Sequence, residues 1–155
     1  MSGKIEARLK ELGLELPPPA KPAANYVPTV RTGNLVYVAG QVPMVDGKFE
    51  YQGKVGREFS IEEGQACARV VALNVLAQLK EACGGDLDRV RKVVKLNGFV
   101  NCLPEFGEQP HVINGASELM IEVFGEMGRH ARAAVGAISL PFGVAVEIDG
   151  VFEVE

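Results

Sequence analysis

The chain has 155 residues, of which 47% are hydrophobic and 23% are charged, and both values are typical of one globular domain with a sizeable core. Its net charge is −4 and it has no basic tract, which argues against a nucleic-acid partner because phosphate binding needs clustered Lys and Arg. No apolar run is long enough to span a bilayer, and residues 1–10 are mixed and charged. We therefore expect a cytoplasmic protein without a membrane partner.

The cysteines and histidines show no pattern of a metal site or a disulfide framework. Cys67, Cys83 and Cys102 are odd in number and widely spaced, and His111 and His130 are the only histidines. Neither a Cys-x-x-Cys pair nor another metal-ligand spacing occurs in the sequence. We expect the cysteines to be inert packing residues and the protein to bind no metal.

The N-terminal segment is predicted to be an appendage to the main domain. Residues 4–12 carry apolar side chains at helical spacing and predict a short helix. Four prolines within residues 17–22 predict a stiff, extended connector. We therefore divide the chain into an appendage, 1–22, and a domain, 23–155.

Two strands are expected at the start of the domain. The stretches 27–30 and 35–39 are rich in β-branched and aromatic residues and flank a turn at 31–34. The second stretch is apolar on both faces, so it is predicted to be a central strand that is covered on both sides. Gly47 and Gly53 then bracket a loop or a short hairpin.

Two long helices and a strand follow. Ser60 and Glu63 form a capping-box pattern, which predicts a helix from there to about Ala82. The stretch 90–100 predicts a strand, and 110–124 predicts the second helix.

The C-terminal segment, 131–152, reads as strand, turn and strand, which we interpret as a hairpin. Arg132 opens its first strand, and Glu147 and Asp149 interrupt an otherwise apolar second strand. Because charges in such strands are costly to bury unless they are paired, this segment is the best candidate for chemistry. Glu147 and Asp149 share one strand face. The alternatives are that Arg132 forms a surface ion pair and that the strand face with Glu147 and Asp149 is exposed to solvent without a functional role.

The predicted elements define an α+β protein with a mixed sheet of five to six strands and two helices on one face. Two helices cover only one face of such a sheet, yet several strands carry apolar residues on both faces. The other face must be buried in another way. The most economical solution is self-association, with the uncovered faces meeting in a closed ring.

Motifs along most of the chain, about residues 25–153, resemble the reactive-intermediate deaminase family (RidA/YjgF), also called the liver perchloric-acid-soluble endoribonuclease family. Each motif is weak alone, but their order and spacing together are specific. Arg132 stands eight residues before Leu140 and fifteen before Glu147, as in the family. The motifs are Tyr26-Val27, Ala39-Gly40-Gln41-Val42-Pro43, the strand 92–102, Asn114, and Arg132 with Leu140-Pro141 and Glu147.

The resemblance implies a chorismate-mutase-like fold of the bacillary type, a homotrimer with sites between subunits, and no metal or organic cofactor. It implies hydrolysis of reactive enamines and imines, such as 2-aminoacrylate, to 2-keto acids and ammonia. In such members the arginine matching Arg132 binds the substrate carboxylate, and the glutamate matching Glu147 positions the attacking water. The residues matching Tyr26, Gly40 and Asn114 line the pocket.

Each implied role has a structural alternative. Tyr26 is otherwise an aromatic anchor in the core, Gly40 a bulge residue and Asn114 a helix cap. His130 assists Arg132 or is a satisfied structural histidine. The pKa of Glu147 rises if burial dominates and falls if Arg132 lies close, and either state orients water.

The chain departs from the family directly after the arginine. Family deaminases have a Ser-Cys or Thr-Cys pair there, and this chain has Ala133-Ala134, so a divergent subfamily is indicated. Hydrolytic deamination is the function that we expect. A non-catalytic protein that binds keto or imino acids is the first alternative, and an endoribonuclease is the second.

Overall fold

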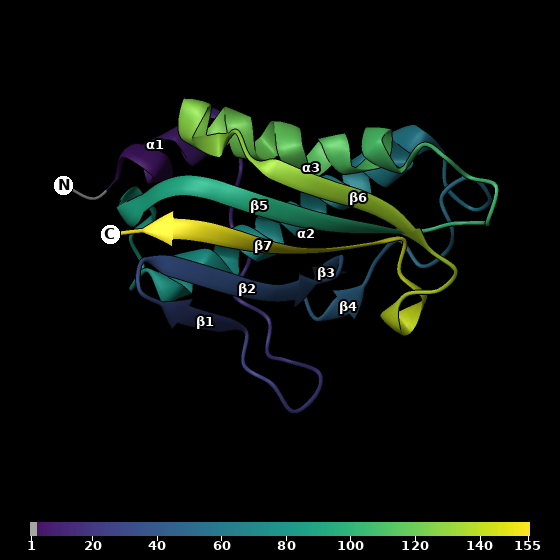
Figure 1. Cartoon of the computed structure of the whole chain (residues 1–155), viewed down its shortest axis with the longest axis horizontal. Coiled ribbons are helices and arrows are strands. Elements are labelled where there is room, and N and C mark those ends of the chain that lie inside the picture. Colours follow the sequence, from purple (N-terminus) through teal and green to yellow (C-terminus); the bar gives the residue numbers. More distant parts are fainter. Residues whose placement is uncertain (1–2) are drawn as a thin grey trace.

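A computed structural model describes residues 3–155 of the protein. Its centre is a five-stranded mixed sheet with the strand order β1-β2-β7-β5-β6, and a separate two-stranded sheet joins β3 to β4 (Figure 1). Only the β5–β6 pair of the large sheet is parallel. The strands are β1 (Thr29–Thr32), β2 (Leu35–Gln41), β3 (Met44–Val45), β4 (Lys48–Phe49), β5 (Val90–Asn101), β6 (Ala131–Ala137) and β7 (Val146–Val154).

Helices α2 and α3 pack against each other and cover one face of the large sheet (Figure 1). The predicted capping box begins α2: the Ser60 hydroxyl accepts from the Glu63 amide at 3.1 Å, and the Glu63 carboxylate accepts from the Ser60 amide at 2.9 Å. The α+β architecture predicted from the sequence is therefore confirmed. The helices are α1 (Lys4–Glu11), α2 (Ile61–Ala82) and α3 (Gln109–Phe124), with the 3-10 turns η1 (Leu87–Arg89), η2 (Gly125–Gly128) and η3 (Pro141–Gly143).

The core lies between the sheet and the two long helices. Strand β7 alternates buried and half-buried residues along its whole length, so Val146 and Ile148 enter the core. The opposite face of the sheet remains open within one chain, where Tyr37 and Val135 are each 46% exposed.

Two expectations about the sheet are wrong. Strands β6 and β7 do not form a hairpin, because β5 lies between them and pairs with both. Strand β2 is not covered on both sides, because its outer face, with Tyr37, is open within the chain. The residues that connect β6 to β7, 138–145, form a loop long enough to cross the end of β5, so adjacency in sequence did not dictate pairing.

The predicted N-terminal helix is present as α1, and it packs onto the domain. Ile5 and Leu9 join the hydrophobic core, and the amides of Lys4 and Ile5 donate to the Asp88 carboxylate at 3.1 and 2.9 Å. Further along, the Gln78 side chain donates to the carbonyl of residue 20 at 2.6 Å. The predicted segment 1–22 thus lies against the domain, and only its first two residues fall outside the described part.

The three cysteines are buried and unbridged, as predicted. Burial raises the pKa of the Cys67 thiol to about 12, so this thiol is inert at neutral pH. Within residues 3–155, no cluster of three His, Cys, Asp or Glu side chains is arranged to hold a metal. Nor does any helix of that range have the length and apolar character needed to cross a membrane.

Candidate functional site

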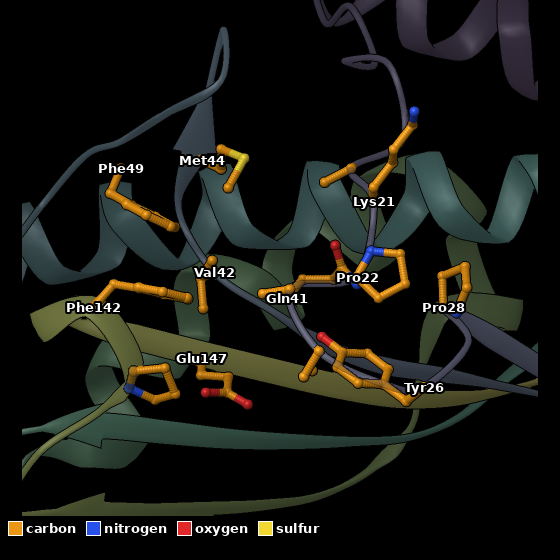
Figure 2. A pocket seen from close by; sticks show the side chains of 15 residues that line it. Lys21, Pro22, Tyr26, Pro28, Gln41, Val42, Met44, Phe49, Phe142 and Glu147 are labelled. Carbon is orange, nitrogen blue, oxygen red and sulfur yellow. The ribbon is translucent and has the colours of Figure 1, made fainter.

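A pocket of about 290 Å³, here called the Glu147 pocket, opens beside β7 and the bulged end of β2 (Figure 2). The Glu147 carboxylate lies at its floor, with Tyr26 on one side and Phe142 on the other (Figure 2). Three predicted site residues, Tyr26, Gly40 and Glu147, are therefore brought together. The remaining walls come from the segment before β1, the end of β2, the β3–β4 hairpin and η3: residues 20–24, Pro28, Gln41, Val42, Met44, Phe49 and Pro141.

Gly40 makes room for the Glu147 carboxylate. The β2–β7 register shifts between Val38 and Gln41, and this irregularity carries the Gly40 backbone past the glutamate. A Cβ atom at position 40 would overlap Oε2 of Glu147 and lie 3.1 Å from its Cδ. Gly40 therefore has both predicted roles. It is a bulge residue, and the bulge lets its backbone approach the carboxylate in the pocket.

Glu147 is half-buried, and its pKa is raised. Burial is the main cause, since desolvation disfavours the charged form, and the like charge of Asp149 adds to it. Asp149 itself accepts a hydrogen bond from the Asn97 amide at 2.7 Å. A carboxyl whose pKa is raised toward neutrality suits proton transfer to and from water.

Gly40→Ala is expected to lower the imine hydrolysis that the family resemblance implies by at least about tenfold. The new methyl displaces the Glu147 carboxylate, and misplacement of a reacting group by about 1 Å costs about a hundredfold. Since the displaced atoms are the free end of a side chain, the melting temperature should barely change. Steady-state kinetics and thermal unfolding measure the two effects. Gly107→Ala is the matched control, because a Cβ there meets no atom within 4 Å. Full activity of the position-40 variant would mean that the carboxylate need not lie where it does.

Arg132 is held in a second site by the start of α3. Its Nη1 donates to Asn114 Oδ1 at 2.8 Å and to Ser117 Oγ at 3.2 Å, and Nη2 donates to the Pro110 carbonyl at 3.3 Å. None of the ion pairs formed within residues 3–155 involves Arg132. The guanidinium is therefore fixed by neutral groups, and its positive charge is left to bind an external anion. Asn114, predicted as a pocket residue, acts here by orienting the arginine.

His130 belongs to the same network through Ser117. Because arginine has no acceptor, the Ser117 hydroxyl accepts from Arg132 and donates its own proton to His130 Nε2, at 2.9 Å. His130 Nδ1 then carries the proton and donates to the Gly128 carbonyl at 2.6 Å. Burial lowers the pKa of His130, and the charge of Arg132 lowers it further. A neutral imidazole thus supports the position of Arg132.

The Arg132 site and the Glu147 pocket lie on opposite faces of the sheet. Arg132 is paired with Leu96 of β5, a core residue that faces the helices, and its own partners lie on α3. Glu147 is paired with Phe99 and alternates with the buried residues of β7, so it points to the open face. Within one chain the predicted pair is therefore not assembled.

The family model described as YjgF/chorismate mutase-like, putative endoribonuclease, matches residues 6–148 of the chain. The chain belongs to the RidA/YjgF family. The predicted family and its chorismate-mutase-like fold are thereby confirmed.

The chain is also similar to individual proteins along nearly its whole length. Protein TCP17 of Trypanosoma cruzi is 52% identical over 153 residues, which cover 98% of this chain and 95% of the relative. A crystal structure of a protein of unknown function from Agrobacterium tumefaciens is 55% identical with a TM-score of 0.91, over 97% of this chain and 92% of that one. RidA from an Antarctic Psychrobacter is 31% identical with a TM-score of 0.59, over 88% and 94% of the two chains.

Two aromatic residues of the pocket, Phe49 and Phe142, were not predicted as site residues from the sequence. Phe49 and Phe142 stack with ring centroids 4.2 Å apart and an interplanar angle of 15°. Phe142 directly follows the Leu140-Pro141 motif of the family, which was the available signal. Phe49 is distant in sequence and reaches the pocket through the β3–β4 hairpin, so no local pattern marked it.

Proposed function

We propose that the protein hydrolyses a carboxylate-bearing enamine or imine to a 2-keto acid and ammonia. The observation that carries this proposal is the Glu147 carboxylate, which lies half-buried in a pocket with a raised pKa. Arg132, whose charge has no acidic partner among residues 3–155, supplies the complementary carboxylate clamp. Membership in a family that includes RidA supports the same chemistry.

In the proposed reaction Arg132 binds the substrate carboxylate, and Glu147 orients a water molecule next to the imine carbon. The water oxygen bonds to that carbon as one water proton passes to Glu147, which returns it to the nitrogen, and this gives a carbinolamine. Glu147 then takes the hydroxyl proton and passes it to the amino group, so that the C–N bond breaks, ammonia leaves and the keto group forms. The substrate is reactive by itself, so positioning and proton transfer suffice.

The proposal requires two copies of the chain at each site. Arg132 and Glu147 point to opposite faces of one sheet, so the arginine of one copy must meet the glutamate of the next. The open face of the sheet, with Tyr37 and Val135 exposed, offers apolar surface for that association. A head-to-tail contact that closes into a ring of three satisfies both needs.

Light scattering on the purified protein is expected to report three times the chain mass of 16.6 kDa. The reason is that the open sheet face carries exposed apolar residues, such as Tyr37 and Val135, and that the proposed reaction needs Arg132 and Glu147 in one site. A stable monomer at micromolar concentration would contradict both the trimer and the shared site.

The function itself is tested with an imino acid made in situ by an amino-acid oxidase. Accelerated release of keto acid and ammonia supports the deaminase. A non-catalytic binder is favoured by Ala133-Ala134, which stand where family deaminases have Ser-Cys or Thr-Cys. Keto-acid binding without acceleration would therefore support that second candidate. Arg132-dependent cleavage of RNA by highly purified protein would favour an endoribonuclease, an activity for which the net charge of −4 gives no support.

A further inference from the structure

The Glu147 pocket has an apolar wall that hydrolysis of a minimal enamine does not need. Phe49 and Phe142 stack at this wall, and Met44 and Val42 lie beside them (Figure 2). Phe142 remains 48% exposed in the chain. The stack is thus an open hydrophobic surface that lies next to the Glu147 carboxylate.

The position of Phe142 is maintained at a conformational cost. Its backbone is left-handed, with φ of 61°, a conformation that residues other than glycine rarely adopt and that persists where the surroundings impose it. Two hydrogen bonds impose it here: the Gln52 side chain donates to the Phe142 carbonyl at 2.8 Å, and the Gly53 amide donates to the Gly143 carbonyl at 2.8 Å. Such strain at a pocket wall points to a function for the ring.

The size of the pocket leads to the same conclusion. A volume of about 290 Å³ lies near the lower end of the range of about 300–1,000 Å³ that is typical of pockets for drug-sized ligands. The three-carbon enamine 2-aminoacrylate has about six non-hydrogen atoms, and its carboxylate would be held by Arg132 outside this pocket. A substrate that small would leave the aromatic wall in contact with water. Binding would then not gain the free energy of burying that apolar surface.

We propose that the substrate carries a bulky apolar side chain, aromatic or branched, which packs on Phe49 and Phe142 while Glu147 faces the imine carbon. This inference rests on the proposed function and specifies its substrate class. Aromatic rings in an apolar pocket prefer stacked or edge-to-face contacts with another ring, so a phenyl group is the best probe.

The test compares two side chains at one reaction centre. Calorimetry measures the binding of pyruvate and phenylpyruvate, and kinetics measure the imines that an amino-acid oxidase makes from alanine and phenylalanine. We expect the phenyl compounds to be preferred by at least about tenfold in Kd and in kcat/KM, since each methylene in an apolar pocket contributes about tenfold or more. Equal binding of pyruvate and phenylpyruvate would overturn the inference, whereas turnover of both imines would still leave the deaminase standing. If neither imine is hydrolysed, the proposed function fails and the binding ratio still decides the inference.

Substitutions in the aromatic wall test whether Phe49 and Phe142 cause the preference for phenyl compounds. Phe142→Ala and Phe49→Ala are each expected to bring the phenyl-to-methyl ratio close to one, and Phe49 lies outside the strained loop, so it reports on the wall even if that loop rearranges. Val45→Ala is the control, because Val45 is an exposed residue of the same hairpin outside the pocket, and the ratio should not change. A phenyl preference that survives both aromatic substitutions would contradict the inference. So would a Phe142→Ala variant that loses its assembly while keeping the preference, because the ring would then serve the contact between copies.

Discussion

Arg132→Ala should abolish imine hydrolysis and weaken the binding of 2-keto acids by at least about tenfold. The variant removes a charged donor that Asn114 and Ser117 hold in place and that no acid of residues 3–155 neutralises. Hydrogen bonds to charged groups contribute about 1.5–3 kcal/mol, which sets the scale of the loss. Calorimetry with a 2-keto acid and steady-state kinetics measure both effects.

Arg132→Lys is expected to restore only part of the affinity, since an ammonium group lacks the planar fork of a guanidinium. Arg91→Ala is the matched control, because Arg91 is an exposed arginine of β5 that pairs with Glu155 at the far end of the strand. Keto-acid affinity equal to that of the wild type in the Arg132→Ala protein would eliminate the carboxylate clamp.

Glu147→Gln should reduce turnover by roughly a hundredfold and leave keto-acid binding nearly unchanged. The amide keeps the shape and hydrogen-bonding capacity of the side chain but removes the charge, and loss of a general base costs about a hundredfold or more. The two substitutions should therefore have different effects. Arg132→Ala lowers both keto-acid affinity and turnover, whereas Glu147→Gln lowers mainly turnover. Undiminished turnover of the glutamine variant would remove Glu147 from the water-positioning role.

The pH profile gives this prediction a second readout. Glu147 acts as a base only when ionised, so activity should fall as the pH drops through its pKa. Within one chain, burial and Asp149 raise that pKa above the ordinary carboxyl value. The acid limb is expected to be missing from the residual rate of Glu147→Gln. Asp149→Asn, which removes the neighbouring like charge, should move that limb to lower pH. If the acid limb is identical in the wild type, Glu147→Gln and Asp149→Asn, it reports the titration of a group other than Glu147.

Local signals in the sequence predicted the helices and most strands well. The Ser60–Glu63 pattern predicted a helix to Ala82, and the structure has α2 over Ile61–Ala82. The strand expected at 90–100 is Val90–Asn101. These elements depend on capping and periodicity within the segment itself, so neighbouring residues carry the information.

Strand pairing could not be predicted from such local patterns. The segments 131–137 and 146–154 look like a hairpin in isolation, but β5 enters between them. One signal was present: a strand, a helix and another strand in succession favour a parallel β5–α3–β6 unit, because parallel strands need a long crossover. That unit leaves the other edge of β5 free for β7, and adjacency in sequence gave no hint of this.

The candidate site was predicted residue by residue but not in its arrangement. Motif spacing identified Arg132 and Glu147, yet their placement on opposite faces follows from the register of β5 with both neighbours. The roles of Ser117 and Phe49 depend on contacts between distant segments, which no motif records.

The central claim is that each site takes Arg132 from one copy and Glu147 from another, and mixed assemblies test it most directly. The Arg132→Ala and Glu147→Gln variants, each nearly inactive alone, are co-expressed with different tags and the mixed assemblies are purified. Each ring of three that contains both variants has one contact of its three that joins an intact arginine to an intact glutamate, so about a third of wild-type activity should return. Mixed assemblies that remain as inactive as either parent would show that the two residues do not act together across the contact.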